Sequence, residues 1–275
     1  MTITGFCTDW KEPKLFTIYI LDEKGEIVKD FAPLHDATME NYKDMFNLLG
    51  EYLRSLNLKE VEVEKIVFCG DGDETIWLNV EQLLIEMNIK EKNIFQVLDY
   101  THAKQNLHEI IEQIPFNARN NIEKKCKDLL WKGDIEGIYK EINKVIKSKM
   151  RKGKALKKWK NYFLKNTKRM QYEKFRESCV PCGSGCVESA IRRVINLRLK
   201  APGTFWTREM AECFLFLRSQ LISGRWDIFM TNVTHLKRKF MDSQKNNVFQ
   251  LVKEKVNKQN ELINSNYTQV LMKVA

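Results

Sequence analysis

Segments with the composition of β-strands occur only in the first hundred residues, and from Thr101 onward the pattern is helical nearly to the end. The apolar, β-branched stretch 14–21 is followed by a turn and by a similar stretch over 26–31, which predicts a β-hairpin. Two short strands over 65–69 and 94–98 follow, separated by a helix over 74–87. Antiparallel strands followed by a strand–helix–strand unit predict an α/β fold with a mixed sheet covered by helices.

The composition is that of a globular protein with an anionic partner. With 275 residues, 43% of them hydrophobic and 30% charged, the chain is long enough to bury a real core. No apolar run approaches the roughly 20 residues that span a bilayer, and the first residues lack the pattern of a signal peptide. Seven cysteines, an odd and sparse set, favour a reducing cytoplasm. The net charge of +10 favours a polyanionic partner. Since no apolar run is long enough to span a bilayer, we expect no membrane partner.

The positive charge is concentrated in one predicted helical segment. Between Lys147 and Arg169 there are eleven Lys or Arg and no Asp or Glu, with aromatic residues interleaved. One interpretation is a solvated helix whose aromatic side chains pack inward. The other, which we favour, is a surface that follows phosphates, where each neutralised phosphate steepens the salt dependence by about 0.9 log units. The residues expected to bind nucleic acid here are Lys157, Lys158 and Lys160, beside Trp159, Tyr162 and Phe163.

Two acidic residues lie at positions that suit metal binding. Asp71 lies between two glycines directly after the strand over 65–69, where ligands collect in α/β sheets; a simple turn aspartate is the alternative. Glu188 lies in the first turn of a helix opened by a glycine-rich turn, and the helix dipole or an ion pair with Arg192 is the alternative explanation. A carboxylate followed by cations suits a metal ion beside a phosphate. The cations expected to contact phosphate here are Arg192, Arg193, Arg198 and Lys200.

Three further features are weaker. Asp99 ends the strand over 94–98 and is either the N-cap of the next helix or a member of the site, and His102 is either a packed histidine or a hydrogen-bond partner of a catalytic acid. Three cysteines have the spacing of half a zinc site, but no second pair follows, so buried, unreactive cysteines are the better interpretation. They are Cys179, Cys182 and Cys186.

The order of several blocks resembles bacterial insertion-sequence transposases of the ISKra type, within the DDE group, over roughly residues 10–229. The first block is Trp10-Lys11-Glu12-Pro13-Lys14-Leu15, and Gly70-Asp71-Gly72 with Trp77 follows. The next is Leu98-Asp99-Tyr100-Thr101-His102-Ala103. The last are Arg169-Met170-Gln171-Tyr172, Gly183-Ser184-Gly185-Cys186-Val187-Glu188-Ser189-Ala190, Arg198-Leu199-Lys200 and Phe205-Trp206.

The resemblance implies a ribonuclease H-like core over 10–103 and 181–230, a basic helical insertion over 104–180, and a helical or partly disordered tail over 231–275. Enzymes of this group use three carboxylates to hold two Mg²⁺ (or Mn²⁺) ions about 3.5–4 Å apart, for DNA strand cleavage and transfer. Asp71 would be the second acid and Glu188 the third, both metal ligands and catalytic, with Asp99 and His102 as supporting groups. The implied partners are double-stranded DNA at the transposon ends and further copies of the chain on DNA, in the nucleoid of a prokaryotic cytoplasm.

The first acid of the family does not match. It belongs to a strand upstream of the Trp10 block, but residues 1–8 contain no carboxylate, and Asp9 falls outside the expected strand. We therefore interpret the chain as an N-terminally truncated transposase that lacks the first strand, which leaves two strand edges unpaired and activity in doubt. The alternatives are a non-catalytic nucleic-acid-binding remnant and a structural helical protein with a solvated basic face.

Overall fold

The computed structural model describes residues 12–56, 64–88, 94–200 and 203–274, with side chains of the last helix described up to residue 258. Asp9 and the residues before it lie outside these ranges. The chain divides into a first unit that ends at Ser223 and a second that begins at Gly224. The second unit begins at Gly224, and the tail was expected over 231–275.

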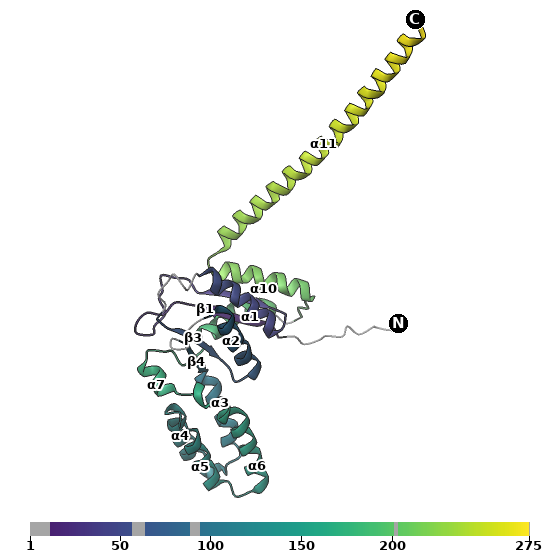
Figure 1. The fold of residues 1–275 in the computed structure, drawn as a ribbon. Helices are drawn as coiled ribbons and strands as arrows, with labels where there is room; N and C mark the ends of the chain where they lie inside the picture. Colours follow the sequence, from purple (N-terminus) through teal and green to yellow (C-terminus); the bar gives the residue numbers. More distant parts are fainter. Residues whose placement is uncertain (1–11, 57–63, 89–93, 201–202, 275) are drawn as a thin grey trace, which may run out of the picture. The chain divides into compact units, whose positions relative to one another are not determined.

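The first unit holds two small sheets, which makes it an α/β unit dominated by helices (Figure 1). Strand β1 (Lys14–Ile18) pairs antiparallel with β2 (Leu34–Thr38), and β3 (Ile66–Gly70) pairs parallel with β4 (Ile94–Leu98). No described strand joins β1 to β3, so among the described residues each of these two strands pairs on one side only. Parallel pairing of β3 and β4 around a helix confirms the predicted strand–helix–strand unit.

The predicted hairpin is partly wrong. Residues 26–31 make one isolated bridge, Leu21 to Ile27, and the partner of β1 is instead β2. The side chain of Asp22 accepts hydrogen bonds from the backbone N–H groups of Lys24 and Glu26, which closes the turn. Residues 26–31 are largely exposed, whereas four of the five residues of β2 are buried. β2 pairs with β1 because β2 is buried against the helices. This burial stabilises the pairing more than the β-branched residues of 26–31 stabilise a hairpin.

Helices cover the sheets and protect one outer edge. The backbone N–H of His35 in β2 donates to Ser223 Oγ at 2.8 Å, and that of Met39 donates to Glu212 Oε2 at 2.6 Å. These side chains come from α10 and its end, so α10 satisfies donors that β1 does not reach. The helices here are α1 (Tyr42–Ser55), α2 (Glu74–Met87) and α10 (Arg208–Ile222).

A helical segment lies between β4 and the glycine-rich turn, as expected for the insertion. Its helices are amphipathic and bury one face in the main core. The same core contains Phe16 of β1, Trp77 of α2 and Val97 of β4. The elements are α3 (Tyr100–Ile111), α4 (Phe116–Trp131), α5 (Ile135–Val145), α6 (Lys149–Lys158), the π-helical η2 (Trp159–Leu164), the 3₁₀ turn η3 (Thr167–Arg169) and α7 (Tyr172–Glu177).

The helix that carries Glu188 runs without a break from α8 (Gly185–Ala190) through the π-helical η4 (Ile191–Asn196) to α9 (Leu197–Leu199). Together with β2 and α10 it forms a second, smaller core of Ala37, Val194, Ile195 and Leu215. The second unit contains α11 (Trp226–Val274). None of the described helices combines the length and apolarity needed to cross a bilayer.

Candidate functional site at the carboxyl ends of β3 and β4

Two aspartates lie next to each other where the parallel pair ends. Asp71 directly follows β3 and Asp99 directly follows β4, and the backbone N–H of Asp99 donates to the carbonyl of Gly70 at 2.7 Å. This bond extends the ladder by one step beyond Leu98. The two carboxylates therefore leave the sheet at the same edge, where ligands collect in parallel sheets.

Asp99 is fully buried and joins three segments. Its Oδ1 accepts hydrogen bonds from the backbone N–H groups of Thr101 at 2.6 Å and His102 at 3.1 Å, which makes it the N-cap of α3. Its Oδ2 accepts the N–H of Ser184 at 2.7 Å, and the N–H of Tyr100 donates to the carbonyl of Cys182 at 2.9 Å. Asp99 thus ties the glycine-rich turn before α8 to the end of β4. The sequence identified the cap but not the second bond.

Asp71 is half-buried and shapes its own turn. Its Oδ1 accepts the N–H of Asp73 at 2.9 Å, and its carbonyl accepts the indole N–H of Trp77 at 2.9 Å. This is the turn aspartate that the sequence left open as an alternative. Its Oδ2 has no hydrogen-bond donor among the described residues. Burial raises the pKa of nearby Tyr42 to about 12, and the negative charges of Asp71, Asp73 and Glu12 add to that shift.

Tyr162 of the insertion lies against this turn. A Cβ at Gly72 would fall 2.2 Å from Cε2 of the Tyr162 ring, so the ring occupies the space that a side chain at residue 72 would need. Burial is the largest cause that raises the pKa of Tyr162 above its usual range, followed by the charges of Asp71 and Asp99. The sequence marked Tyr162 only as one of several aromatic residues in a basic segment. Its contact with a glycine far away in the chain has no signal in the sequence.

Three cations of the basic segment form ion pairs, and of the others all but Lys152 are exposed. Lys158 forms an ion pair with Glu109 of α3, and Lys165 Nζ lies 3.0 Å from Glu74 of α2. The third paired cation is Arg169, which lies 3.3 Å from Glu81. The other eight of the eleven have no ion pair with any described residue; they are Lys147, Lys149, Arg151, Lys152, Lys154, Lys157, Lys160 and Lys168.

The aromatic side chains of this segment pack inward, as one of the two interpretations expected. Phe163 is fully buried, and the indole of Trp159 donates to the carbonyl of Ile135 at 2.9 Å. Lys157 and Lys160 are exposed, whereas Lys158 is turned toward Glu109 and is less available to a ligand than predicted. Inward-packed aromatic side chains are compatible with a phosphate-binding surface on the other face, so binding of nucleic acid by this segment stays a prediction.

Glu188 is exposed and unpaired among the described residues. Its N–H donates to the carbonyl of Ser184 at 3.0 Å, which places it in the first turn of α8, and Ala190 faces the core. The alternative ion pair with Arg192 is not formed, and the helix becomes π-helical directly after α8. The predicted cations Arg192, Arg193, Arg198 and Lys200 are all exposed.

The three-carboxylate metal site of the family pattern is not seen among the described residues. Among the described residues, no group of three or more His, Cys, Asp or Glu side chains is arranged to hold a metal ion. Both oxygens of Asp99 already accept backbone N–H groups, so Asp99 suits a structural role better than a metal. Asp71 and Glu188 each keep a carboxylate oxygen without a hydrogen-bond donor among the described residues, and no contact of the described residues joins one carboxylate to the other. Cys182 donates weakly to the carbonyls of Tyr172 and Val180. Cys179, Cys182 and Cys186 are all partly exposed and not buried as predicted.

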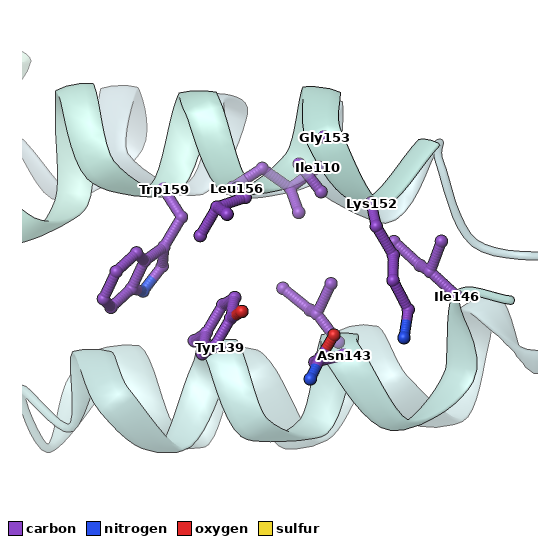
Figure 2. A pocket seen from close by; sticks show the side chains of 10 residues that line it. Ile110, Tyr139, Asn143, Ile146, Lys152, Gly153, Leu156 and Trp159 are labelled. Atoms are coloured by element: carbon purple, nitrogen blue, oxygen red, sulfur yellow. The ribbon is translucent and has the colours of Figure 1, made fainter. Parts of the chain in front are cut away.

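An apolar cavity of about 160 Å³ lies elsewhere, under α6. Figure 2 shows it between two helices, with the rings of Tyr139 and Trp159 at one end and Lys152 at the other. The centroids of those two rings are 4.8 Å apart. Lys152 is the charged residue of its lining, and no carboxylate lines it. This cavity therefore offers space for a small apolar group but no acid–base or metal chemistry.

Comparison with known proteins gives one distant similarity. The chain is 26% identical over 185 residues to UPF0236 protein TTE0402 of Caldanaerobacter subterraneus subsp. tengcongensis, and the match covers 65% of this chain. The same match covers 33% of that protein, so the chain spans about a third of its relative's length. No protein-family model and no solved structure matches the sequence.

Proposed function

We propose that this chain belongs to a transposase-type protein and that it binds DNA through the insertion helix and the cations of the α8–α9 helix. The observation that carries the proposal is the docking of the basic helix over the Asp71 turn by Tyr162. The segment from Lys147 to Lys168 that contains this contact carries eight cations without an ion pair to any described residue. Uncompensated cations on one segment repel each other, and a phosphate backbone relieves that repulsion.

The order of elements supports the same proposal. An antiparallel pair, a parallel β3–α2–β4 unit, a helical insertion and a helix with an early glutamate follow each other as in the ribonuclease H-like core that the sequence resembles. In that core a strand would lie between β1 and β3, and no described strand does. The proposal therefore gives this chain the arrangement of such a core without its complete sheet.

For the chemistry, Asp71 and Glu188 would hold a Mg²⁺ or Mn²⁺ ion. When bound, such an ion polarises a phosphate oxygen and lowers the pKa of water. The residues of the chain have separate tasks: Asp99 fixes the turn that leads to Glu188, and Arg192 and Arg193 neutralise phosphate charge. A non-catalytic DNA-binding remnant is the second candidate, and the absence of a three-ligand group among the described residues favours it.

DNA binding is tested by fluorescence anisotropy of a labelled duplex across a series of salt concentrations. The double variant Lys157→Glu, Lys160→Glu is expected to bind more weakly, and the slope of log Kd against log salt falls by about 1.8, from about 0.9 per lost phosphate contact. The double variant Lys24→Glu, Lys29→Glu changes two exposed lysines outside the basic segment; it makes the same charge change as a control and is expected to bind as the wild type. Absence of binding at low salt, or equal losses in both variants, contradicts the proposal.

Nicking of a supercoiled plasmid separates the two candidates. If the chain is catalytic, Mg²⁺-dependent nicking is lost in Asp71→Asn and in Glu188→Gln while DNA affinity is kept. If it is a remnant, DNA binds and no metal-dependent nicking is seen in the wild type. Nicking that survives both substitutions contradicts the assignment of these two residues.

A further inference from the structure

The apolar cavity beside α6 has the size of a small ligand. Side chains of three helices line it, among them Ile110 of α3, Ile142 of α5 and Leu156 of α6. Its volume of about 160 Å³ is close to that of an engineered apolar cavity of roughly 150 Å³ that binds benzene. The space therefore suits a molecule built around one aromatic ring.

The two ends of the cavity differ in chemistry. The rings of Tyr139 and Trp159 form one end, with an angle of 34° between their planes. At the other end, the side chain of Lys152 runs from α6 toward α5 (Figure 2). Lys152 and Trp159 are seven residues apart, which is about 10 Å along a helix. A ligand that reaches both ends therefore has an aromatic part and a charged part.

Lys152 has no counter-charge in the part of the chain that the structure describes. It forms no ion pair with a described residue, and no carboxylate lines the cavity. Lys152 is half-buried, whereas the other unpaired cations of the basic segment are exposed. A half-buried ammonium loses part of its hydration, and a bound anion compensates for that loss. A carboxylate suits this end better than a phosphate, because one lysine balances one negative charge.

Gly153 leaves room at the side of the cavity. It lies inside α6, where a glycine makes the helix less stable than an alanine does. A Cβ added at Gly153 would have nothing within 4 Å, and the φ of this residue is not in the left-handed region. Neither close packing nor backbone conformation therefore explains a glycine here, whereas access of a ligand to the cavity does.

We propose that this cavity binds a small aromatic carboxylic acid, with its ring against Tyr139 and Trp159 and its carboxylate paired with Lys152. The ring removes apolar side chains from water, and edge or offset packing against the two rings favours an aromatic ligand over an aliphatic one. The proposal does not depend on DNA binding or metal chemistry. An occupied cavity neutralises one unpaired cation of the basic segment.

Three probes test the two parts of the ligand separately. Phenylpropionate has the ring and the carboxylate, phenylpropanol has the ring without the charge, and propionate has the charge without the ring. Isothermal titration calorimetry with the full chain is expected to show phenylpropionate binding about tenfold more tightly than either of the others. Absence of phenylpropionate binding, or equal affinity for one of the other two probes, overturns the proposal.

Variants assign the ligand to this cavity. Lys152→Gln removes the charge and is expected to weaken phenylpropionate about tenfold while the affinity for phenylpropanol stays unchanged. Lys140→Gln makes the same change at an exposed lysine of α5 outside the lining and is expected to bind as the wild type.

Gly153→Leu fills the side of the cavity and is expected to abolish binding of both aromatic probes. Near-ultraviolet circular dichroism, unchanged in all three variants, controls for folding. Wild-type affinity for phenylpropionate in Lys152→Gln or in Gly153→Leu, or an equal loss in Lys140→Gln, contradicts binding in this cavity.

Discussion

The bonds of Asp99 predict an unusually large loss of stability on its removal. Asp99→Ala removes the N-cap of α3, worth about 0.5–2 kcal/mol, and the acceptor of the Ser184 N–H. Each donor left buried without a partner costs about 1–3 kcal/mol, so we expect a loss of about 3–5 kcal/mol in the free energy of unfolding. Asp73→Ala is the matched control. Asp73 caps α2 with one bond to Thr75 N at 2.8 Å and is exposed, so a loss of about 1 kcal/mol is expected.

Urea unfolding followed by far-ultraviolet circular dichroism measures both variants. Hydrogen exchange adds a local readout. The exchange rate of the Ser184 N–H is expected to rise in Asp99→Ala and to stay at the wild-type value in Asp73→Ala. Asp99→Asn keeps an oxygen for the cap but turns an amide donor toward Ser184, so it falls between the two. A loss in Asp99→Ala no larger than in Asp73→Ala refutes the argument that Asp99 ties the glycine-rich turn to the sheet.

Two further predictions concern glycines and thiols. Gly153→Ala lies inside α6 with nothing within 4 Å of the added Cβ, so we expect a gain of about 0.5–1 kcal/mol by urea unfolding. Gly137→Ala in α5 places its Cβ 2.3 Å from the capping carboxylate of Asp134, and no gain is expected. Burial, with the charge of Asp99, raises the pKa of Cys69 to about 12, so at pH 8 about one thiol in ten thousand is ionised. We expect mass spectrometry to show slower alkylation of Cys69 than of the exposed Cys213. The alkylation rate of Cys69 is expected to rise about tenfold for each pH unit below 12.

Local patterns predicted much of the framework. The helix over 74–87 and the strand over 94–98 were predicted at their observed limits, because Asp73 and Asp99 cap the following helices and apolar residues mark the interiors. The prediction of a strand over 26–31 was wrong, because local β-propensity does not indicate which segment is covered by a helix in the folded chain. The partner of β1 was decided by α10, more than 170 residues away.

The sequence predicted individual residues of the candidate site but not the contacts between them. Asp71, Asp99 and Glu188 stand out through glycines, strand ends and helix starts, which are local signals. The bond from Asp99 to Ser184 and the contact of Tyr162 with Gly72 join parts of the chain more than eighty residues apart. Such contacts depend on how the insertion packs against the sheets. The spacing of residues in a single sequence does not predict that packing.

The contact of β2 with α10 also bears on the order in which the chain assembles. The smaller core needs Ala37 from near the start of the first unit and Leu215 from near its end, so it closes only after almost all of that unit has left the ribosome. The insertion helices, whose contacts are mostly local, gain structure earlier. During synthesis the outer edge of β2 therefore stays exposed until α10 is made. Misassembly of the nascent chain is favoured during this interval.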